Sequence, residues 1–237
     1  MKAMILAAGL GSRFKPWTDK HPKALAVING KSLLQRNIAY LQQAGIYNVV
    51  VNVHHFAEQI EEAIRNNDGW GSHVMVSDER DEVLETGGGL MKAAPLLTDD
   101  AFVLMNVDIL TNINLVDMIN THRQLMPLAT LAVSKRETSR YFVFDHFNNL
   151  SGWLNVKTGE EKIVRTTADK HPKAFSGIHI IDPRIFQLVT RKGKFSMVEL
   201  YLDLAKEEII KAYDHSGSAF IDVGKPEAVA EAERMFP

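Results

Sequence analysis

The first half of the chain alternates between short apolar runs and segments with helical periodicity. The apolar runs cover residues 2–6, 49–53, 73–77 and 101–107, and the helical patterns cover residues 32–44, 56–64, 87–94 and 115–122. This order predicts an α/β fold with a mainly parallel sheet, because parallel strands need crossover connections, and these are usually helices. Ligands of such sheets bind beyond the carboxyl ends of the strands. We therefore expect the functional loops after Leu6, Val53, Ser77 and Val107.

The second half of the chain is richer in strand patterns. Strands are predicted at 128–133, 141–144, 150–154, 174–181 and 218–221, and helices at 185–189, at 197–208 and from Pro226 onward. No linker or low-complexity segment divides the chain. We predict one domain over residues 1–237, Rossmann-like and doubly wound, with a small β-rich lobe in its second half.

Composition excludes several classes of function. The net charge of -2 at pH 7 gives no basic surface for nucleic acid, and the absence of cysteine excludes disulfides and thiolate chemistry. No apolar run approaches the roughly 20 residues of a membrane span. The N-terminal run ends in a glycine loop and lacks a cleavage pattern. We therefore expect a cytoplasmic protein without a nucleic-acid or membrane partner.

A glycine loop follows the first strand. Residues 7–16 read AAGLGSRFKP, and glycines in this position let backbone N–H groups approach a phosphate closely. The loop lacks the GxxxxGK[ST] pattern of a P-loop, and Phe14 stands where a dinucleotide-binding loop needs its third glycine. The remaining interpretation is a polyphosphate site, in which the loop converges with Arg13 and Lys23.

Two aspartates end apolar strands. Asp108 follows the run 101–107, and Asp222 follows residues 219–221. A carboxylate at the end of a buried strand is costly unless it is paired or bound to a cation, although aspartates also serve as turn and cap residues. Two such carboxylates could share one Mg²⁺ with phosphate oxygens.

A second glycine run, Gly87 to Gly89, opens a predicted helix. Glycines at this point indicate either a helix start crowded against the sheet or a close approach of the backbone to a nucleotide base or ribose. The sequence leaves both interpretations open.

Taken in order, these motifs resemble the signature of the sugar-1-phosphate nucleotidylyltransferases. The matching segments are LAAGLGSRFKPWT at 6–18, HPKAL at 21–25, ETGGG at 85–89, NVD at 106–108, FSGIH at 175–179 and FIDVG at 220–224. Ala24 departs from the pattern, which usually has a second proline there. The resemblance implies an enzyme that joins a nucleoside triphosphate to a sugar 1-phosphate with Mg²⁺ and releases pyrophosphate. It also implies a nucleotide-binding half, 1–125, and an acceptor-binding half, 126–237, which supplies the second metal aspartate.

The resemblance also implies roles for individual residues. Arg13 would stabilise the leaving pyrophosphate, Lys23 would contact the α-phosphate or the sugar phosphate, and Asp108 and Asp222 would hold Mg²⁺. The expected nucleotide contacts are Ala8, Gly9, Gly11, Ser12, Glu85, Thr86, Gly87 and Asn106. The expected contacts to the sugar phosphate are Asn155, Lys157, Ser176 and Gly177, with Lys162 and Arg165 competing with Lys157 for the phosphate.

Substrate choice is less constrained. The segment LETGGG at 84–89, the pattern GWxN at 152–155 and the short chain look most like the N-acetylmuramate-1-phosphate uridylyltransferases of cell-wall recycling. Mannose-1-phosphate guanylyltransferases, and short cytidylyltransferases acting on phosphocholine or a similar phosphate, are alternatives. A nucleotide-sensing module without chemistry is the alternative outside enzymes. The sequence does not indicate an oligomeric state.

Overall fold

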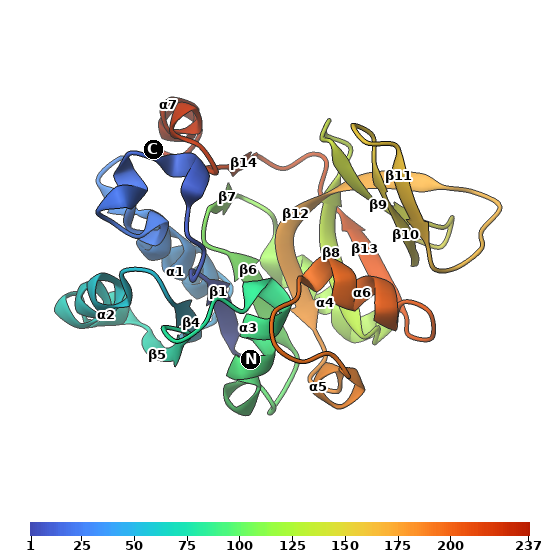
Figure 1. The fold of residues 1–237 in the computed structure, drawn as a ribbon, viewed down its shortest axis with the longest axis horizontal. Helices are drawn as coiled ribbons and strands as arrows, with labels where there is room; N and C mark the ends of the chain where they lie inside the picture. Colours follow the sequence, from blue (N-terminus) through green and yellow to red (C-terminus); the bar gives the residue numbers. More distant parts are fainter.

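The computed structural model describes residues 1–237 and contains a ten-stranded sheet with helices on both faces (Figure 1). Its parallel part consists of four strands in the spatial order β6-β1-β4-β5. These are β1 (Ala3–Leu6), β4 (Asn48–Val53), β5 (His73–Asp78) and β6 (Phe102–Asn106). The predicted α/β fold with doubly wound, Rossmann-like organisation is confirmed.

Two apolar layers hold the helices against the sheet. Side chains alternate along β1, so that Ala3 and Ile5 face one layer while Met4 and Leu6 face the other. The first layer is completed by α1 (Leu33–Gln43), α2 (Ala57–Asn66), α4 (Leu115–Leu125) and α7 (Val229–Met235). The second layer is completed by α3 (Glu85–Ala93), α5 (Ile185–Leu188) and α6 (Met197–Leu204).

A single long strand joins the two halves of the sheet. Strand β12 (His171–Ile181) pairs antiparallel with β6, β8 (Ala129–Ser134) and β9 (Arg140–Phe144). Beyond β9, the strands β10 (Leu150–Asn155) and β11 (Glu160–Ile163) extend the antiparallel lobe at the right of Figure 1. Strand β13 (Ile210–Asp214) lies parallel to β8.

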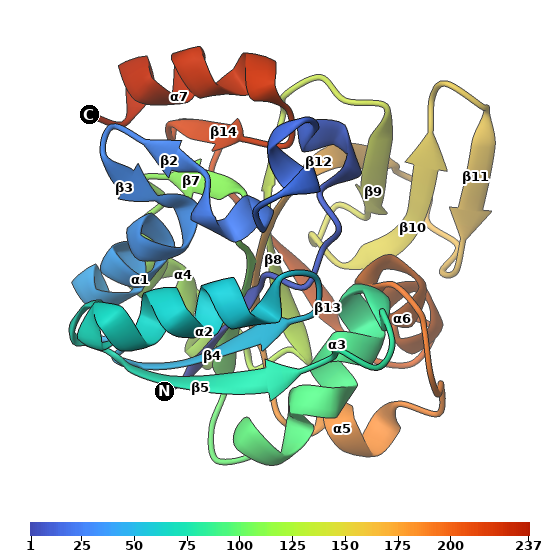
Figure 2. The same ribbon diagram turned by 60° about the vertical axis from the view of Figure 1, so that its left-hand side comes forward.

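Two small sheets lie outside the large one. Strand β14 (Phe220–Asp222) pairs with β7 (Ile109–Thr111), and β2 (Val27–Ile28) pairs with β3 (Lys31–Ser32). Figure 2 shows α7 lying over this group of short strands. None of the helices is both long and apolar enough to cross a bilayer.

The structure differs from the sequence prediction mainly in the second half. The helix predicted at 197–208 is wrong in its last turn, because α6 ends at Leu204 and β13 begins at Ile210. Strand β11 was not predicted, because all four of its residues are exposed and give no apolar signal. The strands β7 and β13 were also missed, because partners distant in the sequence define them.

Candidate active site

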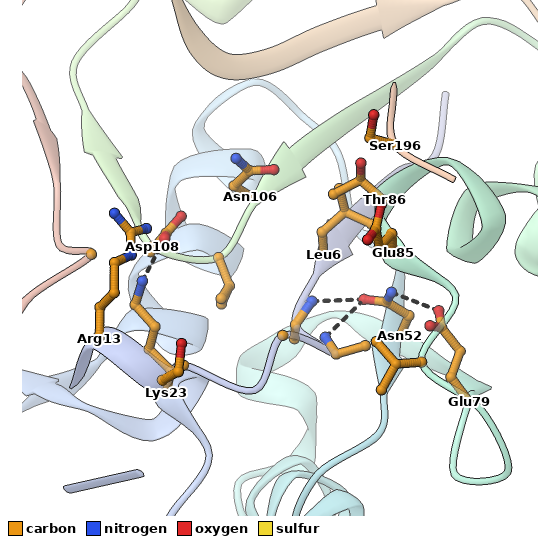
Figure 3. A pocket seen from close by; sticks show the side chains of 18 residues that line it. Leu6, Arg13, Lys23, Asn52, Glu79, Glu85, Thr86, Asn106, Asp108 and Ser196 are labelled. Atoms are coloured by element: carbon orange, nitrogen blue, oxygen red, sulfur yellow. Dashed lines mark hydrogen bonds and ion pairs between the residues drawn. The ribbon is translucent and has the colours of Figure 1, made fainter. Parts of the chain in front are cut away.

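A pocket of about 450 Å³ lies at the carboxyl edge of the parallel strands (Figure 3). Its walls come from the loop after β1, from the end of β4, from the loop after β5 and from the end of β6. This is the edge at which the strand order predicts a ligand. Ten of the expected site residues line it: Ala8, Gly9, Gly11, Ser12, Arg13, Lys23, Glu85, Thr86, Asn106 and Asp108.

The pocket has two chemically different ends. Arg13, Lys23 and Asp108 lie together at one end, at the left of Figure 3. Asn52 and Glu79 lie at the other end, beside Glu85, Thr86 and Ser196. A ligand that spans the pocket would therefore meet cations at one end and polar or acidic groups at the other.

Gly11 shapes the cationic end. It adopts the left-handed conformation, with φ 61°, and a Cβ atom added there would lie 2.7 Å from Cγ2 of Thr18. The Thr18 hydroxyl donates a hydrogen bond to the Gly11 carbonyl oxygen at 2.9 Å. This contact folds the chain back on itself, so that Lys23 returns to the start of the loop. Gly9 has no atom within 4 Å of the same added Cβ, and its open side belongs to the pocket.

The two predicted metal aspartates come together through the pairing of β14 with β7. Asp222 lies opposite Ile109 in the ladder, and the Val223 N–H donates to the Asp108 carbonyl oxygen at 2.8 Å. Burial raises the pKa of Asp222, the charge of Asp108 raises it further, and the cations Lys23, Arg13 and Arg136 oppose this rise. Lys23 forms an ion pair with Asp108 at 2.5 Å.

These carboxylates fit a magnesium ion that arrives with phosphates. No third histidine, aspartate or glutamate joins them, since no group of three such residues could hold a metal. Mg²⁺ is commonly held by one or two carboxylates together with substrate phosphates and water. Asp108 and Asp222 would hold the ion, and a polyphosphate in the pocket would supply the remaining oxygens.

The opposite end contains a buried network that the sequence analysis missed. The Asn52 Oδ1 atom accepts hydrogen bonds from the N–H groups of Ala7 at 2.6 Å and Ala8 at 3.3 Å, and its Nδ2 donates to Glu79 Oε1 at 2.7 Å. Glu79 is only 1% exposed, and its second oxygen, Oε2, makes no hydrogen bond. Burial raises the pKa of Glu79.

Two signals in the sequence could have revealed this network. Asn52 is the one polar residue in the apolar run 49–53, and Glu79 directly follows the strand of residues 73–78. A buried polar side chain must be hydrogen-bonded, so an asparagine at the end of such a strand indicates a partner nearby.

The glycine run at the start of α3 is crowded by protein atoms. A Cβ atom on Gly87 would lie 2.5 Å from the Phe195 ring, and the Gly87 N–H donates to the Phe195 carbonyl oxygen at 2.9 Å. A Cβ atom on Gly89 would lie 2.6 Å from Oε1 of Glu79. The crowded interpretation therefore holds for this run. Glu85 and Thr86, just before it, line the pocket, whereas Gly87 does not, so its contact with a base stays a prediction.

The residues expected to bind the sugar phosphate lie outside this pocket. Asn155 ends β10, and its Oδ1 accepts a hydrogen bond at 3.0 Å from the backbone N–H of Lys157, which is exposed. Lys162 lies over the Trp153 ring, and Arg165 donates to the Glu208 carbonyl oxygen. The structure brings none of these cations into the pocket, so their role stays a prediction.

Ser176 and Gly177 lie behind the pocket wall. The Ser176 side chain is fully buried, and its hydroxyl forms a hydrogen bond of 2.7 Å with Nε2 of His215. Gly177 has φ 71°, and an added Cβ atom would lie 2.9 Å from the Nδ2 of Asn106, which lines the pocket. Gly177 therefore packs against Asn106 on the side away from the pocket. A direct contact of either residue with the sugar stays a prediction.

The site places cations suited to a polyphosphate beside carboxylates suited to a divalent metal. Such a site, at the edge of an α/β sheet, is typical of proteins that bind nucleotide phosphates. The chain belongs to the nucleotidyl transferase family, whose model matches residues 2–236. This confirms the resemblance to the sugar-1-phosphate nucleotidylyltransferases, and the protein is an enzyme of this type. The non-enzymatic alternative is therefore not supported.

Known relatives cover almost the whole chain. It is 30% identical over 239 residues to the N-acetylmuramate alpha-1-phosphate uridylyltransferase of Caulobacter vibrioides, covering 98% of this chain and 95% of the relative. It is 26% identical to the mannose-1-phosphate guanyltransferase beta-A of Xenopus laevis, covering 95% of this chain and 62% of the relative. The crystal structure of HddC from Yersinia pseudotuberculosis has the same fold, with a TM-score of 0.80 at 23% identity, covering 100% of this chain and 99% of that one.

Proposed function

We propose that the enzyme joins UTP to N-acetylmuramate 1-phosphate, giving the uridine-diphosphate sugar and pyrophosphate. The relative from Caulobacter vibrioides and a second one from Neisseria meningitidis, 28% identical over 99% of this chain, both carry this activity in their names. Such an enzyme would act in cell-wall recycling in the cytoplasm.

The observation that favours uridine is the agreement between these two relatives, which match almost the whole chain and are named for the same base and the same sugar. At the polar end of the pocket, Asn52 accepts from the Ala7 and Ala8 N–H groups and donates to Glu79, so this network fixes the backbone against which a base would lie. Glu79 itself is buried, so it would act on the base through the position of Asn52 rather than by direct contact.

The cationic end suits the triphosphate and its departing pyrophosphate. Arg13 offers a planar set of donors and Lys23 a mobile point charge, and both line the pocket with the glycine loop. The acceptor phosphate is already an anion, so the residues need to position and neutralise charge rather than remove a proton. Magnesium, when bound to Asp108 and Asp222, supplies positive charge beside the reacting phosphate oxygens.

A pyrophosphate-release assay with Mg²⁺ tests the proposal. UTP, GTP, CTP, dTTP and ATP are each combined with the 1-phosphates of N-acetylmuramate, N-acetylglucosamine, glucose and mannose, and with phosphocholine. We expect one dominant signal, from UTP with N-acetylmuramate 1-phosphate. A dominant GTP–mannose or CTP–phosphocholine signal would overturn the substrate assignment and leave the reaction class intact.

A further inference from the structure

Several cations lie around the two aspartates. The positive charges of Lys23, Arg13 and Arg136 all act on the Asp222 carboxylate. The geometry agrees for Arg13. The point where a Cβ atom on Gly224 would sit is 2.7 Å from the Asp222 Oδ1 atom and 3.2 Å from the Arg13 Nη2 atom.

Arg136 approaches the two aspartates from the second half of the chain, residues 126–237. The Arg136 guanidinium lies 4.8 Å from the centre of the Phe220 ring, and Phe220 stands two residues before Asp222 on β14. One of its nitrogen atoms donates to the Phe175 carbonyl oxygen, which fixes the group in place.

Lys23 pairs directly with Asp108, which lines the pocket. Its ammonium group contacts Asp108 Oδ2, and the two side chains are only 10% and 19% exposed (Figure 3). Oδ2 is one of the two Asp108 oxygens through which a divalent ion would bind. A bare dication entering this site would have to displace the ammonium and would then lie beside an unpaired positive charge.

We propose that Lys23 is the resident counter-ion of Asp108 in the free enzyme, so that the metal enters only together with the phosphates of the nucleotide. This inference rests on the proposed nucleotidyl transfer at this site. When a metal–triphosphate complex arrives, Asp108 exchanges the ammonium for the metal and Lys23 exchanges the carboxylate for a phosphate oxygen. Every charge keeps a partner through the exchange, which neither the metal nor the phosphate alone can achieve.

The loop architecture permits this exchange. The backbone around Lys23 is held by the contact of Gly11 with Thr18, while the ammonium sits on a flexible four-carbon stem. The charged group can therefore move between two partners without a rearrangement of the loop. Lys23 thus has two roles: it competes with bare metal for Asp108, and it contacts phosphate once the nucleotide is bound.

A Mn²⁺-binding measurement at constant ionic strength tests the inference. The electron paramagnetic resonance signal of the free ion reports how much Mn²⁺ is unbound. The proteins are the wild type, Lys23→Met, Lys23→Gln, the double variant Lys23→Met/Asp108→Asn, and Lys15→Met as the matched control. Lys15 belongs to the same loop, but it is 64% exposed and pairs with Asp19. Each protein is measured without nucleotide and with UTP in the absence of an acceptor, and its melting temperature reports folding.

We expect the wild type and the Lys15 variant to bind Mn²⁺ weakly alone and tightly with UTP. Removing the ammonium should tighten binding of Mn²⁺ alone about tenfold or more, because it removes one adjacent unit charge. The same variants should lose affinity for Mn²⁺ with UTP, and the added Asp108→Asn change should abolish the gain. If the methionine variant is unstable, the glutamine variant and the wild type still test the inference.

Two results would overturn the inference: tight binding of Mn²⁺ to the wild type without nucleotide, or no gain in either Lys23 variant. These are separate from failure of the proposed function. If the Lys23 variants gain Mn²⁺ affinity but no triphosphate and acceptor pair gives pyrophosphate, the counter-ion role stands and the reaction is wrong. If turnover is found without the gain, the reaction stands and the counter-ion role is wrong.

Discussion

Replacing Gly11 by alanine should destabilise the protein much more than the same change at Gly9, two residues earlier. Gly11 has φ 61°, and its new Cβ atom would lie 2.7 Å from Thr18 Cγ2 and 3.2 Å from Lys23 Cβ. Gly9 has a negative φ, and no atom lies within 4 Å of its new Cβ atom. The two substitutions are chemically identical, so the difference between them measures the geometry alone.

The expected magnitude has two parts. An alanine in the left-handed conformation costs about 1–2 kcal/mol, and forcing a methyl group into a packed contact costs about 1–3 kcal/mol. Together they predict a loss of roughly 2–5 kcal/mol for Gly11→Ala, whereas Gly9→Ala should stay within about 0.5 kcal/mol of the wild type. A domain is stable by only about 5–15 kcal/mol, so the loss at Gly11 is easily measured.

The assay is urea unfolding followed by circular dichroism, combined with pyrophosphate release. Gly11→Ala should also reduce turnover, because Lys23 is displaced, whereas Gly9→Ala should keep its stability and weaken nucleotide binding, because its methyl group enters the pocket. Thr18→Ser removes the clashing methyl group and keeps the hydroxyl that bonds to Gly11. In a double-mutant cycle it should therefore recover the packing part and leave the backbone part.

Equal losses for Gly9→Ala and Gly11→Ala would refute this reasoning. The reasoning would also be refuted if the double variant Gly11→Ala/Thr18→Ser lost as much unfolding free energy as the two single variants together. The clash with the Thr18 methyl group would then contribute nothing.

Three further predictions concern the two ends of the pocket. Asp222→Asn should abolish turnover in the pyrophosphate-release assay with little change in the melting temperature, because the Asp222 side chain is exposed and asparagine keeps its shape without its charge; turnover near the wild-type rate would contradict a role in holding the metal. Glu79→Ala should lower kcat/KM for UTP and CTP together, because Asn52 loses the partner that holds it against the Ala7 and Ala8 N–H groups; Glu82→Ala at an exposed position is the control, and a changed ratio between UTP and CTP would contradict this indirect role. Asn52→Ala should lower the free energy of unfolding in urea by about 3 kcal/mol, because the Ala7 N–H, the Ala8 N–H and Glu79 lose their buried hydrogen-bond partner. A loss below about 1 kcal/mol would show that these hydrogen bonds contribute little.

The alternation of apolar runs and helical patterns determined the fold class by itself. Burial on both faces makes each parallel strand a short apolar run, and the helices between them carry one apolar stripe, so both signals are local. The position of the site followed from the same pattern, because the pocket lies where the loops after Leu6 and Val107 were expected to bind a ligand. The resemblance to the family supplied the individual residues, ten of which line the pocket.

Other features depend on contacts between segments that are far apart in the chain. The pairing of β14 with β7 sets Asp222 beside Asp108, and the return of the chain through Thr18 puts Lys23 on the same carboxylate. No local pattern specifies which distant strands pair, since the register depends on which surfaces the whole fold buries.

The Asn52–Glu79 network and the packing of Phe195 on Gly87 have the same origin. Asn52 and Glu79 lie at the ends of the neighbouring strands β4 and β5, and Gly87 meets Phe195 from a distant part of the chain, because buried polar groups must find hydrogen-bond partners. The sequence therefore determined which residues reach the edge of the sheet. The tertiary structure determined which of them meet, because that depends on pairing and packing between segments far apart in the chain.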